Sequence, residues 1–126
     1  MALTLETILR DALADEIDNL INGGTAPELV FETSGDVEVA TIIMNATNAF
    51  GAAATGVITM TGQPLSDTSA TGGTVAQFSI YQNVTQTNKA LEGVVAVSGQ
   101  DIDLTSLSVG ATDTVELTTF TITVPA

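Results

Sequence analysis

Residues 118–124 read Thr-Thr-Phe-Thr-Ile-Thr-Val, and this stretch decides the fold class of the chain. From Thr119 onward apolar side chains alternate with threonine, so the apolar side chains share one face of a strand and the threonines share the other. Val115 and Leu117, just upstream, fall in the opposite phase, which predicts a β-bulge or bend near Thr118-Thr119. The stretch is typical of a strand with one buried and one solvated face.

Similar period-two patterns recur along the chain after Gly24. They predict strands at 28–33, 37–44, 56–61, 75–82, 93–97, 102–107 and 114–124. Ser34-Gly35-Asp36 has the composition of a tight hairpin turn, and the stretches 48–55 and 62–74, rich in small and polar residues, are typical of loops. We therefore expect a mainly β fold, an antiparallel β-sandwich of jelly-roll type, with one N-terminal amphipathic α-helix.

A helical period governs residues 1–24. Thr4 is the expected N-cap of this helix, Asn22-Gly23-Gly24 is its expected end, and Glu6 and Arg10 stand in the order that favours an ion pair. The apolar residues at helical spacing are Leu5, Ile8, Leu9, Ala12, Leu13, Ile17, Leu20 and Ile21. We expect a single domain over 1–126, composed of the helix and turn (1–24) and the β-sandwich (25–126).

The apolar stripe of this helix is wide enough to face both its own domain and a neighbour. At about 100° per residue it covers more than half of the circumference. The helix could cover an open end of the sheet, form a contact between subunits, or attach to a membrane, although its acidic polar face would be repelled by anionic lipid. As a subunit contact, the stripe has as its spine the candidate interface residues Leu5, Leu9, Leu13, Ile17 and Leu20.

The charge balance excludes several classes of function. The 126 residues contain 15 acids and two bases, for a net charge of −13, which leaves too few cations to bind nucleic acid. Because the chain has no Cys and no His, thiol chemistry, Cys/His zinc sites and His-based catalysis are excluded. The acids within the N-terminal stripe oppose a signal peptide or a membrane span. We expect a non-enzymatic protein with no catalytic, cofactor-binding or metal-ligating residues.

One acidic pair invites a chemical interpretation. Asp101-x-Asp103 places two carboxylates on one face of a strand, but the further ligands and the glycine of a calcium loop are missing, so we expect solvated strand-edge acids. Glycan cleavage needs two convergent carboxylates, and no such pair stands out. Aromatic residues that could stack on a sugar are few, and Phe78 and Phe120 occupy inward-facing positions typical of a core.

Two further motifs have a structural explanation. Asp15, Glu16 and Asp18 follow one another on the helix, and we expect them to form a solvated face, except that Glu16 lies within the apolar stripe, where we expect it at the solvated edge. Residues 49–56 read Ala-Phe-Gly-Ala-Ala-Ala-Thr-Gly and lack the lysine and the spacing of a phosphate-binding loop. Their small side chains indicate either a close approach of backbone or a flexible crossing.

The order of these segments resembles a family of small virion structural proteins of tailed bacteriophages. The resemblance covers nearly the whole chain, from the helix that ends in Gly-Gly to the final strand. It rests on Pro27-Glu28-Leu29-Val30-Phe31-Glu32, Val39-Ala40-Thr41-Ile42, residues 49–58, residues 72–81, residues 97–104 and residues 118–125. These are strand-and-turn patterns without chemical motifs, so no active-site residues follow from the resemblance.

The resemblance implies a capsid cement or decoration protein. Such a protein binds the lattice of the major capsid protein and copies of itself at the capsid surface, after synthesis in the host cytoplasm. An acidic, base-poor body suits this role, because it would stay soluble and would not adhere to DNA during assembly. A tail or fibre-associated module that binds host glycans is the alternative, and a glycan-cleaving enzyme is a third possibility.

Overall fold

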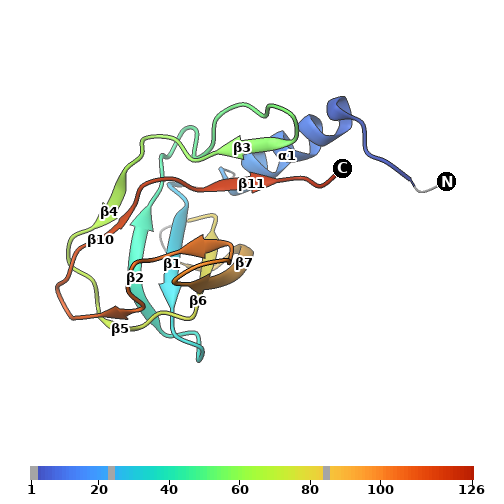
Figure 1. Cartoon of the computed structure of the whole chain (residues 1–126). Coiled ribbons are helices and arrows are strands. Elements are labelled where there is room, and N and C mark those ends of the chain that lie inside the picture. Colours follow the sequence, from blue (N-terminus) through green and yellow to red (C-terminus); the bar gives the residue numbers. More distant parts are fainter. Residues whose placement is uncertain (1–2, 23–24, 84–85) are drawn as a thin grey trace.

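The computed structural model describes residues 3–22, 25–83 and 86–126 of the chain. These residues form a mainly β structure with one α-helix and a curled sheet, so the predicted mainly β class with an N-terminal helix is confirmed (Figure 1). The elements are α1 (Thr7–Ile21), β1 (Glu28–Glu32), β2 (Glu38–Ile43), β3 (Val57–Thr59), β4 (Leu65–Asp67), β5 (Gly73–Thr74), β6 (Gln77–Tyr81), β7 (Lys89–Ala96), β8 (Ile102–Asp103), β9 (Ser108–Val109), β10 (Val115–Leu117) and β11 (Thr121–Thr123).

The largest unit is a five-stranded sheet with the order β2-β1-β6-β7-β8. Strand β1 pairs antiparallel with β2 and β6, and β6 pairs antiparallel with β7. The predicted hairpin at 34–36 is confirmed: Asp36 has a φ of 62°, and its amide donates to the carbonyl of Thr33 at 3.1 Å. Among the described strands, the antiparallel expectation fails only where β8 joins β7, since that pairing is parallel.

Three two-stranded antiparallel ladders accompany this sheet. They join β11 to β3, β10 to β4, and β5 to β9. Figure 1 shows β3 and β11 running above the sheet toward α1, while β4 and β10 lie at the opposite end. Strand β4 is fastened to the sheet by Asp67, whose Oδ2 accepts the amide of Thr41 at 2.9 Å.

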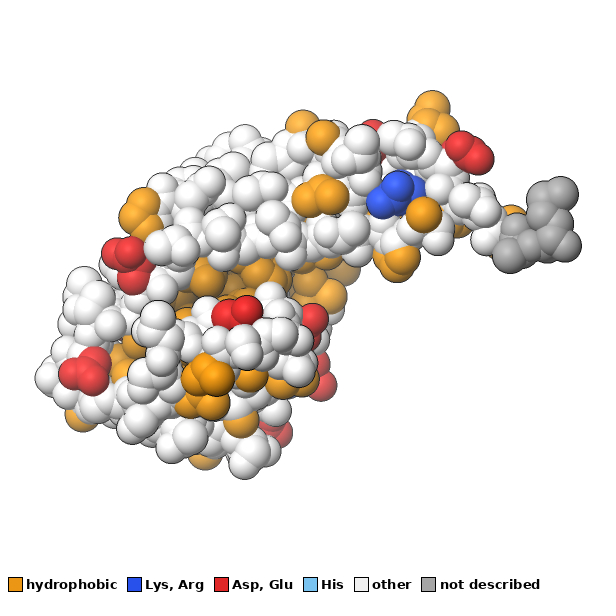
Figure 2. Space-filling view, in the orientation of Figure 1, with side chains coloured by type: hydrophobic (Ala, Val, Ile, Leu, Met, Phe, Trp, Pro, Cys, Tyr) orange, Lys and Arg blue, Asp and Glu red, His pale blue; other side chains and the backbone are white. Residues whose placement is uncertain are grey.

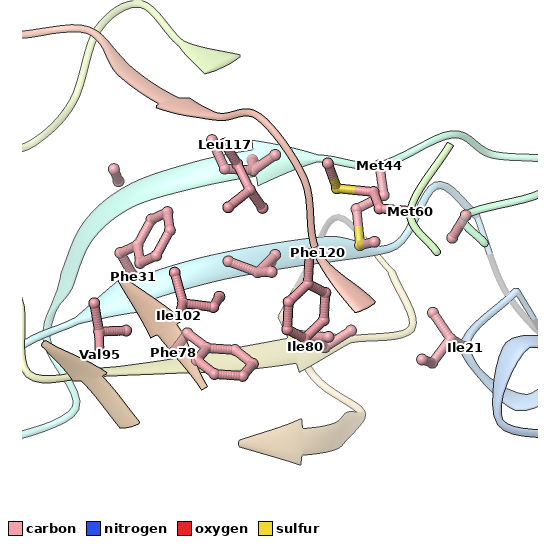
Figure 3. Close-up of a cluster of buried hydrophobic side chains, with 14 of the residues drawn as sticks. Ile21, Phe31, Met44, Met60, Phe78, Ile80, Val95, Ile102, Leu117 and Phe120 are labelled. Carbon is pink, nitrogen blue, oxygen red and sulfur yellow. The ribbon is translucent and has the colours of Figure 1, made fainter. Parts of the chain in front are cut away.

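One apolar core joins the sheet, the ladders and the helix. Phe120 precedes β11 and reaches toward Phe78 and Ile80 of β6, and Ile21 of α1 lies beyond Ile80 (Figure 3). The rings of Phe120 and Phe78 meet edge to face, with centroids 5.4 Å apart and planes at 78°. Phe120 also packs against Phe50 at a centroid distance of 6.0 Å. Both Phe78 and Phe120 are buried, which confirms their prediction as core.

The C-terminal strand changes phase where the sequence predicts a bend. Strand β10 ends at Leu117 and pairs with β4, whereas β11 begins at Thr121 and pairs with β3. Leu117 and Phe120 are buried on either side of the exposed Thr118 and Thr119. The interruption therefore lets both segments turn their apolar side chains inward.

Other strand boundaries differ from the prediction. The predicted loop 62–74 contains β4 and β5, and β7 begins at Lys89, four residues before the predicted strand at 93–97. The predicted strand 102–107 is reduced to β8, and β9 forms just beyond it at Ser108–Val109. Short strands such as β5 form because a partner backbone is near, and they carry no alternation that a sequence pattern could show.

Candidate interaction surface

Helix α1 lies against β3 at one end of the molecule, and the N-terminal segment extends away from it (Figure 1). The helix begins at Thr7 and not directly after Thr4, because Leu5 packs against the core in a non-helical segment. Glu6 holds the N-cap position but makes no side-chain cap. Asn22 is the C-cap, and Gly23 and Gly24 of the predicted stop lie outside the described residues.

Four polar side chains on one side of α1 bind the backbone of residues 49–56. These are Asp11, Asp15, Asp18 and Asn22, which we call the polar ridge. Their spacing of four, three and four residues places them on one side of the helix. Their Oδ1 atoms accept backbone amides as follows: Asn22 from Ala49 at 3.2 Å, Asp18 from Phe50 at 3.1 Å, Asp15 from Ala53 at 2.8 Å, and Asp11 from Gly56 at 2.5 Å.

The expectation of a solvated acidic face holds for Asp15 and Glu16, which are exposed, whereas Asp18 is half-buried. Asp15 and Asp18 serve as hydrogen-bond acceptors for a loop more than 30 residues away, and only Glu16 remains as an exposed acid without such a role. The close backbone approach predicted for residues 49–56 is confirmed, because their small side chains let the amides reach the helix. The spacing of Asp11, Asp15, Asp18 and Asn22 was the sequence signal for this contact.

Arg10 fastens the same helix to the C-terminal segment. Its Nε donates to the carbonyl of Val124 at 2.9 Å, so the predicted ion pair with Glu6 does not form. Among the described residues the only salt bridge joins Lys89 to Glu92. Gly56 lies directly against the guanidinium, since a Cβ there would be 2.9 Å from the Arg10 Nε. Glycine is favoured here for a second reason: its φ of +79° lies in the left-handed region, which residues with a Cβ rarely adopt.

The apolar stripe divides between a covered and an exposed side. Ala14 and Ile21 are fully buried, and Leu5 and Ile17 are half-buried against the core. Of the predicted spine, Leu9, Leu13 and Leu20 are 46%, 42% and 56% exposed. Ile8, which the spine did not include, is 83% exposed. We call Leu9, Leu13 and Leu20 the apolar helix face; Ile8 precedes Leu9 by one residue and points about 100° away from it.

The apolar helix face has the spacing of a helix-packing seam. Leu9, Leu13, Glu16 and Leu20 follow one another at intervals of four, three and four residues, the repeat that lines the contact between two packed helices. Glu16 is exposed and accepts a weak hydrogen bond from Asn19 Nδ2 at 3.4 Å. The helix thus uses one ridge to bind its own loop and presents another, largely apolar ridge to solvent.

Asp18 titrates differently from an ordinary surface acid. Burial against the loop raises its pKa above the usual 3.8, and the nearby charge of Asp15 adds to the rise. The hydrogen bonds from the Phe50 amide and the Asn22 side chain act in the opposite direction but do not cancel the effect of burial. Asp18 therefore contributes through its position as an acceptor more than through its charge.

Asp101 and Asp103 shape a turn. Asp101 Oδ2 accepts the amide of Val94 at 3.0 Å, and the Asp103 carboxylate accepts the amides of Gly99 and Gln100 at 3.3 and 3.1 Å. Both residues are exposed, as expected of strand-edge acids. No group of three or more potential metal ligands occurs in the described ranges.

Two other carboxylates converge on the opposite face of the sheet. Gln86 Nε2 donates to Glu28 Oε2 at 3.1 Å and to Glu38 Oε2 at 3.2 Å, so the amide lies between the two acids. Glu28 is buried, and desolvation together with the charge of Glu38 raises its pKa above 4.5. Close by, the buried Glu32 accepts the hydroxyl of Ser79 at 2.6 Å. The Ser79–Glu32 hydrogen bond links β6 to β1, and Gln86 links Glu28 of β1 to Glu38 of β2.

Comparison with known proteins finds no match to a family model, to a curated protein or to a solved structure. The helix of the described chain does not have the length and apolarity needed to cross a membrane.

Proposed function

We propose that this chain is a non-enzymatic structural protein of a bacteriophage virion, a capsid cement or decoration protein. It binds the lattice of the major capsid protein and copies of itself at the capsid surface, and it thereby stabilises the head. The observation that carries the proposal is the apolar helix face, a row of exposed aliphatic side chains on a helix that is firmly fastened to its body.

The surface chemistry supports an assembly role. An exposed apolar row of this kind is a common mark of protein contacts. Because each leucine is already about half-buried, covering the rest of its side chain stabilises a contact by about 1 kcal/mol. Because the same contact would repeat around a shell, modest individual affinities add up to strong attachment. The net charge of −13 opposes direct packing of two free copies, so the capsid lattice is the surface that brings copies together.

The sandwich arrangement of the sheet and the ladders is part of the same proposal. We infer that the curled five-stranded sheet and the β3–β11, β4–β10 and β5–β9 ladders form a sandwich of jelly-roll type, antiparallel except for the β7–β8 pairing. Phe120 supports this arrangement, since it spans from the β11 segment to the sheet. A crystal structure would test it through the strand order and the packing of the two layers.

Cryo-electron microscopy of purified virions tests the location. Density for this chain at symmetry-related sites over the capsid, with α1 against a neighbouring subunit, is the expected result. Density confined to the tail would replace the cement role with the tail or fibre module, and particles without the chain would overturn both.

A variant pair tests whether the apolar helix face makes the contact. Leu13→Asp should abolish incorporation into particles, whereas Thr105→Asp, which adds the same charge at an exposed site outside the helix, should not. Leu13→Gln keeps a good helix former and should reduce incorporation while the isolated protein stays folded. Normal incorporation of both Leu13 variants would contradict the proposal, as would incorporation that falls only in proportion to lost stability.

A further inference from the structure

A groove separates β11 from the part of β7 that β8 does not cover. One part of the groove, about 240 Å³, is lined by the apolar residues Phe78, Leu91, Phe120 and Ile122 and by the polar residues Glu92, Asp101, Thr121 and Thr123. A second part, about 290 Å³, continues from it along β8 and β10 and shares Asp101, Phe120 and Thr121 with the first. Figure 2 shows this hollow, with hydrophobic side chains at its base.

The edge of β7 facing the groove has free backbone groups. The amide of Val95 donates to Ala76 beside β6, whereas the amide of Val94 points the other way, to Asp101. Because backbone groups alternate along a strand, the N–H and C=O of Glu92 also point away from β6. Strand β8 pairs only with Val95 and Ala96, so no described strand pairs with the part of this edge before Val94.

The edge of β11 that faces the groove also has backbone groups that pair with no described strand. Phe120 accepts the amide of Met60, and the amide of Val124 donates to Gly56, so positions 120, 122 and 124 direct their backbone groups toward β3. By the same alternation, Thr121 and Thr123 direct theirs away from β3. Within the described chain β11 has β3 as its only partner strand.

The charge of the groove selects its occupant. Its lining contains the carboxylates of Glu92, Asp101, Asp103 and Glu116 and no lysine or arginine. Lys89 pairs with Glu92 from outside the lining, which leaves the other three acids without a cation. An extended peptide that alternates apolar and basic side chains would match both the apolar floor and the acidic rim.

We propose that this groove binds an extended, basic and apolar segment of a partner protein by strand addition. The segment hydrogen-bonds to Glu92 on one side and to Thr121 and Thr123 on the other, and it lies end to end with β8. Main-chain hydrogen bonds supply affinity, while the floor and rim select the side chains. The proposal is independent of the apolar helix face, which lies on a different element.

Titration with synthetic peptides tests the proposal. The probe is acetyl-Lys-Val-Lys-Val-Lys-Val-amide, its control is acetyl-Glu-Val-Glu-Val-Glu-Val-amide, and amide NMR spectra report binding. We expect the lysine peptide alone to shift the amides of Glu92, Thr121 and Thr123 and to protect them from hydrogen exchange. The amide of Ile122 faces β3 and serves as an internal control.

Two variants separate the backbone and charge contributions. Thr123→Pro removes an N–H that faces the groove and spares those that face β3, so peptide affinity should fall about fivefold to tenfold while folding is retained. Glu116→Lys reverses a charge on the rim at an exposed position and should weaken the lysine peptide. Equal binding of both peptides, shifts located on α1, or no shifts at millimolar peptide would each overturn the proposal. Protection of the same amides by self-association without peptide would also overturn it, because a second copy would then be the occupant.

Discussion

Replacement of Asp18 by alanine is the sharpest test of how the helix is fastened. The change removes the acceptor for the Phe50 amide and for Asn22 Nδ2, which lie 3.1 and 2.6 Å from Asp18 Oδ1. Phe50 is 1% exposed, so its amide has little access to water as a replacement partner. Leaving a buried donor without a partner costs roughly 1–3 kcal/mol. Removal of a desolvated carboxylate offsets part of this cost, and we expect a net loss of about 2 kcal/mol in the free energy of unfolding.

Urea denaturation followed by circular dichroism measures this loss. With a slope of about 2 kcal/mol per molar urea, the midpoint of Asp18→Ala should fall by about 1 M at pH 7. Asp18→Asn keeps an oxygen in the same place without the charge, so its stability should stay close to that of the wild type. Glu16→Ala is the matched control on the exposed side of the same helix and should change stability by less than about 0.5 kcal/mol.

The three variants together can refute the role of the polar ridge. If Asp18→Ala were no less stable than Glu16→Ala, the hydrogen bond to the loop would contribute nothing to folding. If Asp18→Asn were as unstable as Asp18→Ala, the charge of Asp18 and not its acceptor position would be responsible. Because the pKa of Asp18 is raised in the folded state, Asp18→Asn should also reduce the gain in stability that the wild type shows on mild acidification.

Three further predictions concern other parts of the fold. Gly56→Ala should lower the free energy of unfolding by about 1–3 kcal/mol and lower the thermal midpoint. Position 56 has a left-handed backbone conformation, and a Cβ there would also meet the Arg10 guanidinium. An unchanged midpoint would contradict this packing. Ser79→Ala removes the donor to the buried Glu32 and should cost about 1–3 kcal/mol in urea denaturation, and a neutral result would mean that Glu32 finds another partner. Burial raises the pKa of Glu28 above 4.5, so the folded state binds more protons than the unfolded state just above that pH. The free energy of unfolding should therefore rise as the pH falls from 7 toward 4.5. Glu28→Gln should show a smaller rise, and identical pH profiles for the two proteins would refute this.

Local patterns predicted the fold class because each depends on neighbouring residues alone. The alternation over residues 119–124 and the hairpin turn at 34–36 both appear in the structure, as does the phase change before Phe120. The helix was predicted from its apolar spacing, with its N-cap placed at Thr4, two residues before the observed N-cap Glu6. In each case burial of the apolar positions provides the driving force, and the sequence displays those positions directly.

Pairings between distant segments were decided only by the tertiary structure. Strands β4, β5 and β9 exist because another backbone lies beside them, and their own residues show no alternation. The same holds for the groove, which forms because β11 lies opposite the part of β7 that β8 does not cover.

The N-terminal helix shows both contributions in a single element. Its composition and spacing determined that it would be amphipathic and acidic, with an apolar stripe wide enough to face both its own domain and a neighbour. Only the folded chain decided which part is covered, because hydrogen bonds from the polar ridge to residues 49–56 set the rotation of the helix about its axis. That rotation buries Ala14 and Ile21 and leaves Leu9, Leu13 and Leu20 in solvent.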